Sequence, residues 1–415
     1  MSERKLQILL LTPWAPIPTD AGSRRVWTAC RLLKGRYDFH LLTFLRPDGE
    51  DPKQSAAAML GQEKLYFPGL FQSIRNVALP SSYHPCTEEG LELPREIAGF
   101  YSPDMSLAVK KAIRELQPDL VHIEFDLMAP YVRAAKSEAP ALPCILTHHD
   151  LSALSLFSSY FREMSGWKKW RRLGDWRRRL TATRDLCRRF DAVITVSESD
   201  RRRMGRWIPV ERVFSVPTGV DLEHFSGGLP RSEREPDSLV YVGHYPHYPN
   251  EEAVLRFAAQ TWPLIKAARP KARFYVVGSG PTKKIFELSK KDPSIIVTGT
   301  VPDVKPYEAR AMALIAPLKL GYGIKGKILE ALAMGTPVVS SSSANEAIGA
   351  ADGRHLLLAD SPRKFARDTV RLLTDEALWL RISAEGRGFA EQRHSWKTRA
   401  SGIGEVYRGL LAQKA

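Results

Sequence analysis

Residues 321–339, GYGIKGKILEALAMGTPVV, form a glycine-rich segment followed by a short amphipathic stretch and a β-branched run. Gly321 and Gly323 allow a positive φ or a close approach of the backbone to a ligand, and Gly326 removes a side chain where a helix should begin. From Lys327 onward the apolar residues recur with helical spacing, and a Gly-Thr-Pro sequence ends the pattern. The segment predicts a loop, a helix and then a strand.

The start of this predicted helix has the chemistry of a phosphate site. A helix N-terminus carries about half a positive charge and N–H donors, and Lys325 and Lys327 stand beside it. Glu330 lies about 6 to 8 Å further along the helix axis, where a carboxylate can accept hydrogen bonds from the two hydroxyls of a ribose. The segment therefore predicts a nucleotide site, although a tight turn followed by a solvated glutamate would contain the same residues.

The composition of the 415-residue chain is that of a globular protein with two or three domains. Apolar residues make up 44% and charged residues 26%, and the formal net charge is +15. This positive charge attracts anions, and nucleic acid, anionic lipid and phosphorylated small molecules are all anionic. The charge alone leaves the partner open.

Two further features bear on the compartment. The four cysteines have neither metal-binding spacing nor the density of a disulfide scaffold, which favours a reduced protein. The apolar run at residues 6–12 is too short for the core of a signal peptide, and no run reaches the about 18 residues that span a membrane. We expect a cytoplasmic protein without a membrane span.

Short apolar runs alternate with helical patterns in two successive sets, which a polar stretch at residues 226–238 separates. The first set comprises residues 6–12, 39–45, 119–125, 144–150 and 192–198, and the second comprises residues 239–244, 273–279, 295–300, 313–318 and 337–341. Strands separated by helices predict parallel sheets that are covered on both faces. Open α/β sheets of this kind bind ligands at the carboxyl ends of their strands.

We therefore predict an α/β protein with two Rossmann-like, doubly wound domains. The predicted domains cover residues 1–225 and 226–395. A last helix within residues 396–415 is expected to cross back to the first domain.

The segment at 321–339 resembles the donor-site motif of glycosyltransferase family 4 (group 1), whose members are retaining enzymes with the GT-B fold. Seven other stretches resemble the same family in the same order and, with this segment, span most of the chain. They are residues 10–26, 146–155, 192–204, 215–225, 239–254, 274–281 and 297–303. The resemblance implies transfer of a sugar from a nucleotide-sugar donor to a carbohydrate or lipid-linked acceptor, with retention of configuration.

The family places two glutamates at the donor site, with seven residues between them. Glu330 matches the second, which the family uses to bind the nucleotide ribose. Tyr322 stands in the place of the first, which contacts the donor sugar. The resemblance therefore implies ribose recognition by Glu330, and leaves the donor sugar to the backbone around Tyr322, Gly323 and Ile324.

A second departure from the family pattern concerns positive charge. Many members place an Arg and a Lys after the first strand of the second domain to bind the diphosphate. In this chain Gly243 and His244 are followed by a Pro-Asn turn without a lysine or arginine. The positive charge is then expected from Lys327, which shares a helix face with Glu330, or from Lys325.

Two segments of the first half are also candidates. Gly22 and Ser23 begin a predicted helix and could bring backbone N–H groups to an anion, or they could form a plain strand-to-helix connection. His148, His149 and Asp150 end an apolar strand. A histidine at such a place is more often structural, but the resemblance implies that His149 and Asp150 lie near the transferred sugar.

The implied chemistry requires few protein groups. The diphosphate is a good leaving group, positive charge stabilises its departure, and the leaving phosphate itself accepts the proton of the acceptor. The expected catalytic residues are His149, Asp150 and Lys327. Neither a cofactor nor a metal ion is expected, and the sequence contains no cluster with metal-ligand spacing.

Residues 165–190, SGWKKWRRLGDWRRRLTATRDLCRRF, predict a helix with one apolar face and a strongly basic remainder. Such a helix could lie on anionic lipid at the inner face of the membrane and hold the enzyme near a lipid-linked acceptor. It could equally be an ordinary helix with its aromatic residues in the core.

Other functions stay open beside the transferase, for which cell-surface polysaccharide or glycolipid synthesis is the expected setting. A nucleotide-sugar epimerase would need clustered acid and base groups that the sequence does not identify. A relative without activity would bind the donor but not transfer the sugar. A nucleic-acid-binding protein is suggested only by the charge, because no recognition motif is present, and nucleic acid is not the expected partner.

Overall fold

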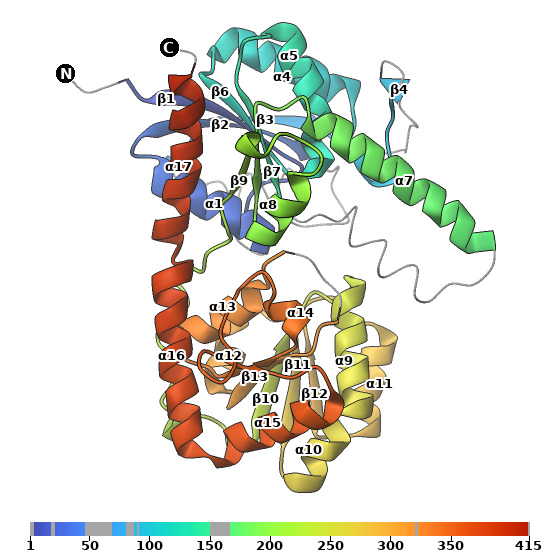
Figure 1. Ribbon diagram of the computed structural model, residues 1–415, viewed down its shortest axis with the longest axis vertical. Helices are drawn as coiled ribbons and strands as arrows, with labels where there is room; N and C mark the ends of the chain where they lie inside the picture. Colours follow the sequence, from blue (N-terminus) through green and yellow to red (C-terminus); the bar gives the residue numbers. More distant parts are fainter. Residues whose placement is uncertain are drawn as a thin grey trace. The chain divides into compact units, whose positions relative to one another are not determined.

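The computed structural model describes residues 4–17, 21–45, 69–79, 87–88, 91–149, 167–319 and 323–413. The chain forms two compact units (Figure 1). Unit 1 comprises Met1–Pro217 together with Arg399–Ala415, and unit 2 comprises Thr218–Thr398. Among the described residues no helix is both long and apolar enough to cross a lipid bilayer.

Unit 1 contains a parallel sheet of seven strands in the order β3-β2-β1-β6-β7-β8-β9. The strands are β1 (Leu6–Thr12), β2 (Tyr37–Leu45), β3 (Phe71–Ala78), β6 (Leu120–Glu124), β7 (Cys144–His148), β8 (Ala192–Thr195) and β9 (Val213–Ser215). A short antiparallel pair joins β4 (Thr87–Glu88) to β5 (Leu91–Glu92).

Helices cover both faces of this sheet because its strands are apolar on both sides. In β1, Leu9 and Leu11 belong to one core, and Ile8 and Leu10 belong to a second core on the other face. The helices are α1 (Ala21–Leu33), α3 (Arg95–Ala98), α4 (Pro103–Leu116), α5 (Val132–Glu138), α7 (Trp167–Cys187), α8 (Glu198–Met204) and α17 (Trp396–Ala412), with 3-10 turns at Asp126–Tyr131 and Val210–Arg212.

The last helix, α17, packs on the sheet of unit 1. Ala400, Ile403 and Tyr407 recur with helical spacing and are buried in the core that contains Ile8. The Tyr37 hydroxyl donates a hydrogen bond to the Gly404 carbonyl at 3.2 Å. Residues from opposite ends of the chain therefore form one core.

Unit 2 contains a parallel sheet of six strands in the order β12-β11-β10-β13-β14-β15. The strands are β10 (Ser238–Val242), β11 (Arg273–Val277), β12 (Ile295–Gly299), β13 (Ala313–Ala316), β14 (Val338–Ser340) and β15 (Leu357–Leu358). The helices are α9 (Tyr248–Gln260), α10 (Trp262–Ala268), α11 (Lys283–Lys291), α12 (Lys305–Arg310), α13 (Gly326–Ala333), α14 (Ser342–Asn345), α15 (Pro362–Thr374) and α16 (Glu376–His394), with a 3-10 turn at Arg231–Glu233.

The two parallel sheets confirm the predicted α/β class, but the boundary at 225/226 is wrong. The chain divides after Pro217, and Val220 and Phe225 already pack in the core of unit 2. The polar stretch 226–238 belongs to unit 2 because the Arg234 guanidinium is buried there and donates to the carbonyl of Ala311 at 2.8 Å. The predicted second domain already included this polar stretch, and its buried hydrogen bonds show how the stretch is packed.

The second boundary also differs from the predicted 395/396, because unit 2 continues to Thr398. The Val220 amide donates to the His394 carbonyl at 2.7 Å, and a Cβ on Gly219 would lie only 2.9 Å from that carbonyl oxygen. The end of α16 is therefore held against the first residues of unit 2.

Candidate functional site

The segment at 321–339 has the predicted local structure. Gly323 has a φ of 72°, in the region that favours glycine, and Lys325 precedes α13 with an extended backbone and a side chain that does not cap the helix. The helix lies between β13 and β14, at the carboxyl end of β13. Gly321 and Tyr322 lie outside the described residues.

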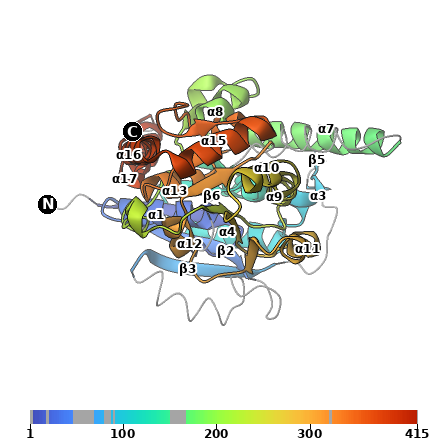
Figure 2. The same ribbon diagram turned by 90° about the horizontal axis from the view of Figure 1, so that it is seen from below.

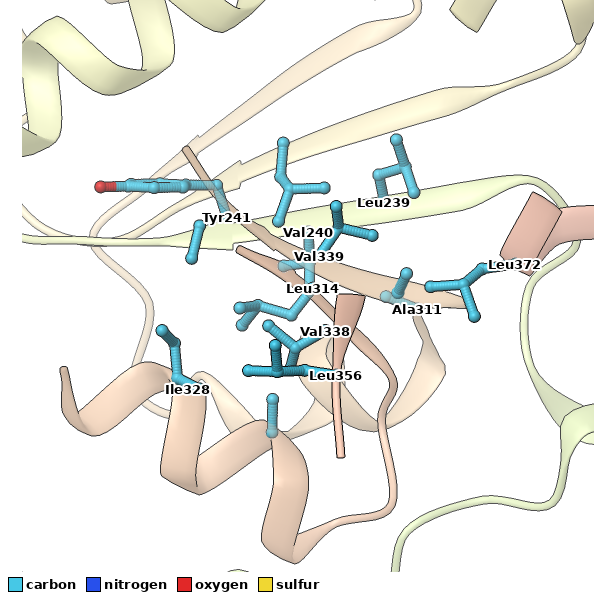
Figure 3. Close-up of a cluster of buried hydrophobic side chains, with 14 of the residues drawn as sticks. Leu239, Val240, Tyr241, Ala311, Leu314, Ile328, Val338, Val339, Leu356 and Leu372 are labelled. Carbon is cyan, nitrogen blue, oxygen red and sulfur yellow. The ribbon is translucent and has the colours of Figure 1, made fainter. Parts of the chain in front are cut away.

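The apolar face of α13 packs on the sheet of unit 2. Ile328, Leu329 and Leu332 are buried, and Figure 3 shows Ile328 directed from the helix towards the strand residues Leu314 and Val338. This packing leaves Lys327 and Glu330 half-buried on another face of the helix. The apolar stripe of the sequence is confirmed.

Lys327 is the cationic group of this region. Its Nζ donates a hydrogen bond to Asn250 Oδ1 at 2.9 Å and lies 4.0 Å from the centre of the Tyr241 ring. The pKa of Lys327 is lowered from 10.5 to about 7. Burial is the largest cause and the charge of Lys325 acts in the same direction, whereas Glu330 and Glu308 oppose both effects. An anion beside Lys327 would restore its charge, so this position is suited to bind a phosphate group.

Asn250 holds Lys327 in place from a different element. The residue lies near the start of α9, and its Oδ1 also accepts a hydrogen bond from the Tyr241 hydroxyl at 2.7 Å. Its Nδ2 donates to the His244 carbonyl at 2.8 Å. The amide group of Asn250 therefore connects β10, the turn after it and α13.

The turn after β10 is closely packed around this asparagine. A Cβ on Gly243 would lie 3.1 Å from a carbon of the Tyr241 ring and 3.2 Å from Asn250 Cγ. His244 is exposed and hydrogen-bonded through Nδ1 to Ser279 Oγ at 2.8 Å. Gly243 therefore leaves room for the Asn250 side chain.

Sequence reasoning did not identify Asn250 as a functional residue. It treated the Pro-Asn turn only as a place where the family's cations are missing. The available signal was an asparagine near the start of a helix, in a turn that follows a strand and a glycine and lacks the cations of the family.

In unit 2 the structure therefore gathers several predicted donor-site residues. The contacts of Asn250 join Gly243, His244 and Lys327. Glu330 is close enough to raise the pKa of Lys327 by its charge, although burial has the larger and opposite effect. Gly323, Ile324 and Lys325 adjoin α13 on the chain, and Ile324 packs against the core.

In unit 1, His149 follows β7 and is held by two contacts. Its Nε2 lies 2.6 Å from Glu124 Oε2, and its ring stacks on Phe125 with 3.8 Å between the ring centres and an angle of 8°. His148 is buried, and no hydrogen bond joins its ring nitrogens to the described residues. Asp150 lies outside the described residues.

The predicted anion loop of unit 1 lies in α1, which begins at Ala21. Ser23 is buried, and its Oγ accepts a hydrogen bond from Trp14 Nε1 at 3.0 Å. Gly22 is half-buried. The Ser23 side chain therefore has a structural partner, and an anion-binding role of Gly22 and Ser23 stays a prediction that concerns their backbone.

The basic segment forms α7, which extends away from the sheet of unit 1 (Figure 1 and Figure 2). Its second half is embedded in the unit, where Leu186 and Cys187 belong to the core. Trp176 is half-buried, whereas Arg177 and Arg178 are exposed. The helix is therefore part core element and part exposed basic surface.

No group of His, Cys, Asp and Glu side chains in the described parts of the chain is arranged to hold a metal ion. The thiols of Cys30 and Cys187 are buried, and burial raises the pKa of each well above its ordinary value. These two cysteines are therefore structural.

Both halves of the chain are similar to known protein families. Residues 22–224 match the family described as Glycosyltransferase Family 4, and residues 236–375 match the family described as Glycosyl transferases group 1. The two matches fall on the two structural units and together cover most of the chain.

Two curated relatives and one solved structure illustrate the similarity. D-inositol 3-phosphate glycosyltransferase 2 of Catenulispora acidiphila is 28% identical over 47% of this chain and 50% of its own length. TuaC of Bacillus subtilis, whose name assigns it to teichuronic acid biosynthesis, is 26% identical over 64% of each chain. The match thus spans half of the first relative and less than two thirds of the second.

The solved structure of Anabaena Alr3699/HepE in complex with UDP and glucose has 15% identity and a TM-score of 0.69, over 97% of this chain and 100% of its own. At this identity the likeness establishes the fold, which is the two-domain GT-B fold. With both halves matched by their family descriptions and the predicted donor-site helix in place, the chain belongs to the group 1 glycosyltransferases of glycosyltransferase family 4.

Proposed function

We propose that this protein transfers a sugar from a nucleotide-sugar donor to a carbohydrate or lipid-linked acceptor, with retention of configuration. The observation that carries the proposal is the Lys327 ammonium, which Asn250 holds beside the first turn of α13 and whose pKa burial lowers to about 7. A site of this kind gains most from a ligand that brings its own negative charge, such as a diphosphate. Membership of the family supports the reaction class.

Each residue of the donor site has a distinct proposed role. Glu330 accepts hydrogen bonds from the ribose hydroxyls, and Lys327, with the first N–H groups of α13, binds the diphosphate. Lys325 adds positive charge, and the backbone at Gly323 and Ile324 contacts the donor sugar. Stabilisation of the departing diphosphate is then the main catalytic effect.

The remaining steps follow from the same arrangement. The leaving phosphate oxygen accepts the proton of the acceptor hydroxyl as the new glycosidic bond forms on the face that the diphosphate leaves. His149 and Asp150 are proposed to contact the reacting sugar. The reaction is proposed to proceed without a metal ion, because Lys325, Lys327 and the helix N-terminus supply the positive charge.

The similarities suggest which donor and which setting to test first. The Anabaena structure contains UDP and glucose, so UDP is the first candidate nucleotide. The name of the Bacillus relative concerns teichuronic acid biosynthesis, which supports a role in cell-surface polysaccharide or glycolipid assembly. The exposed arginines of α7 support a peripheral contact with anionic lipid on the cytoplasmic side.

A second candidate function rests on Tyr322, which replaces the glutamate that contacts the donor sugar in the family. A chain that recognises only the nucleotide would bind the donor but not transfer the sugar. Epimerase activity and nucleic-acid binding are less well supported, because no residue cluster or recognition motif favours either.

Two measurements test the transferase. A thermal-shift screen at fixed salt uses UDP, GDP, ADP, TDP and CMP, with NAD and a DNA duplex as controls, because a ligand of the native state raises its melting temperature. The nucleotide that gives the shift then selects the nucleotide-sugars for a nucleotide-release assay with EDTA present. Release supports a metal-independent transferase, a shift without release on any acceptor supports the binding-only alternative, and a shift with DNA alone refutes the proposal.

A further inference from the structure

We propose that Glu124 is the positioning residue of His149, and that it holds this histidine in the tautomer with the proton on Nε2 and Nδ1 free to accept a hydrogen bond. The proposal rests on the transferase function and concerns the contact of His149 in unit 1 with the reacting sugar. The sequence analysis singled out His149, but it assigned no role to Glu124.

The geometry around His149 restrains both the place and the plane of its ring. Glu124 is the last residue of β6 and only 2% exposed, and its Oε2 lies 2.6 Å from His149 Nε2. The next residue, Phe125, stacks on the imidazole ring. Its φ of 70° is rare for a bulky residue, and the Phe125 amide donates to the Thr147 carbonyl at 3.0 Å. A strained conformation at this position is a feature of functional sites.

The charge of Glu124 decides which nitrogen of His149 carries the proton. Burial alone would raise the pKa of Glu124, but His122, His149 and Arg25 outweigh it, so the pKa lies below its ordinary value and the carboxylate is ionised. An ionised carboxylate only accepts hydrogen bonds, so His149 donates from Nε2. No hydrogen bond joins Nδ1 to the described residues. When the ring is neutral, a proton held on Nε2 makes Nδ1 the nitrogen that accepts a hydrogen bond from a hydroxyl group.

The other side of Glu124 is connected to three further elements. His122 Nε2 lies 3.5 Å from Glu124 Oε1 and 2.7 Å from Thr147 Oγ1, and His122 Nδ1 lies 2.6 Å from the Tyr407 hydroxyl on α17. The Arg25 guanidinium on α1 is buried, and its charge acts on Glu124. Burial lowers the pKa of His122 and the charge of Glu124 opposes this effect, while the Arg25 guanidinium adds a positive charge to the network.

This network restrains the histidine from the core of the unit. Glu124 itself is buried behind the ring, so it orients His149 and does not contact the substrate. A hydroxyl of the donor or acceptor sugar is the group that His149 Nδ1 is arranged to bind. The arrangement resembles other sites in which a carboxylate fixes the tautomer of a functional histidine.

The direct test is nitrogen-15 NMR of the full-length protein with labelled histidine, in which the His149→Gln spectrum assigns the His149 signals. We expect the wild-type His149 signals to show a protonated Nε2 and an unprotonated Nδ1. A wild-type spectrum with the proton on Nδ1 overturns the proposal, and this measurement does not depend on the folding of any Glu124 variant.

The variant Glu124→Gln keeps the shape of the side chain but can donate as well as accept. We expect both tautomers of His149 and a fall in kcat of at least about tenfold. The thermal shift with the nucleoside diphosphate should stay unchanged, because the nucleotide contacts lie in unit 2. Glu115→Gln, the same change on the exposed side of α4, is the matched control and should leave tautomer and kcat unchanged.

The outcomes separate this proposal from the transferase function. An unchanged tautomer, or a changed tautomer with unchanged kcat in Glu124→Gln, overturns the positioning role. Absence of nucleotide binding and release in the wild type refutes the transferase function instead, and the histidine spectra then still report whether Glu124 selects the tautomer.

Discussion

Nucleotide affinity should depend on pH through Lys327. The free side chain has a pKa of about 7, whereas an ordinary lysine has a pKa of 10.5. A bound diphosphate favours the ammonium and should return the pKa towards its ordinary value. Above pH 7 the Lys327 amine of the free protein has largely lost its proton, whereas in the complex it is protonated. Binding of the nucleotide therefore takes up a proton from solution.

The size of the effect follows from linkage. Between about pH 8 and pH 10 the dissociation constant should rise about tenfold per pH unit, because each unit costs about 1.4 kcal/mol to protonate the free amine. From pH 7 to pH 9 the loss is about 2.3 kcal/mol, because half of the free amine is already deprotonated at pH 7. Below about pH 6 the Lys327 amine is already protonated, so the dissociation constant no longer changes with pH through this group. The terminal phosphate, whose pKa is about 6, is almost fully ionised above pH 8, so its own titration does not contribute to the slope there.

Isothermal titration calorimetry from pH 6 to pH 10, with buffers of different ionisation enthalpy, measures both the affinity and the proton uptake. Lys327→Met should remove the slope and weaken binding at pH 6 by about 1 to 3 kcal/mol. Lys290→Met, at an exposed lysine near the end of α11, is the matched control and should keep the slope. A wild-type affinity that is constant from pH 7 to pH 10 would refute the reasoning.

Four further outcomes are expected. Glu330→Gln should weaken binding of the nucleoside diphosphate by about 1 to 3 kcal/mol, and should have a much smaller effect on binding of an analogue without ribose hydroxyls; equal losses for both ligands in calorimetry would exclude ribose recognition. Asn250→Ala should weaken nucleotide binding in the same assay, because the Lys327 ammonium loses its partner. Lys327→Met should raise the free energy of unfolding of the ligand-free protein at pH 7, measured in urea, by on the order of 1 to 3 kcal/mol, because a desolvated amine is removed. Tyr407→Phe should lower the same quantity by about 1 kcal/mol through the lost hydrogen bond to His122, with Tyr307→Phe as the control.

The local elements around the donor site followed from the sequence. The glycines before α13, its apolar stripe and the Gly-Thr-Pro that ends it are signals between near neighbours, and the helix is observed at Gly326–Ala333. The strand at 39–45 is observed at Tyr37–Leu45, and the strand at 337–341 at Val338–Ser340. Such elements are predictable because their periodicity and end signals lie within one segment.

Long-range contacts decided what these elements do. Lys327 and Asn250 are 77 residues apart, and Glu124 and His149 are 25 residues apart. Nothing in the local pattern of either segment indicates its partner. The lowered pKa of Lys327 likewise depends on the burial that the folded sheet imposes, so the sequence named the lysine but not its state.

The boundary between the units is a second case in which local sequence pattern and tertiary contacts differ. The sequence predicts that the second domain starts with the polar stretch at 226–238, whereas that unit begins at Thr218, and Arg234 in the stretch is buried and bonded to residues more than 70 positions away. The sequence by itself determined the fold class, the helix at Gly326–Ala333 and the family, because periodicity and motifs are local. The tertiary structure alone decided the partners of Lys327 and His149, because the burial and hydrogen bonds that set their charge and tautomer arise only when distant strands meet.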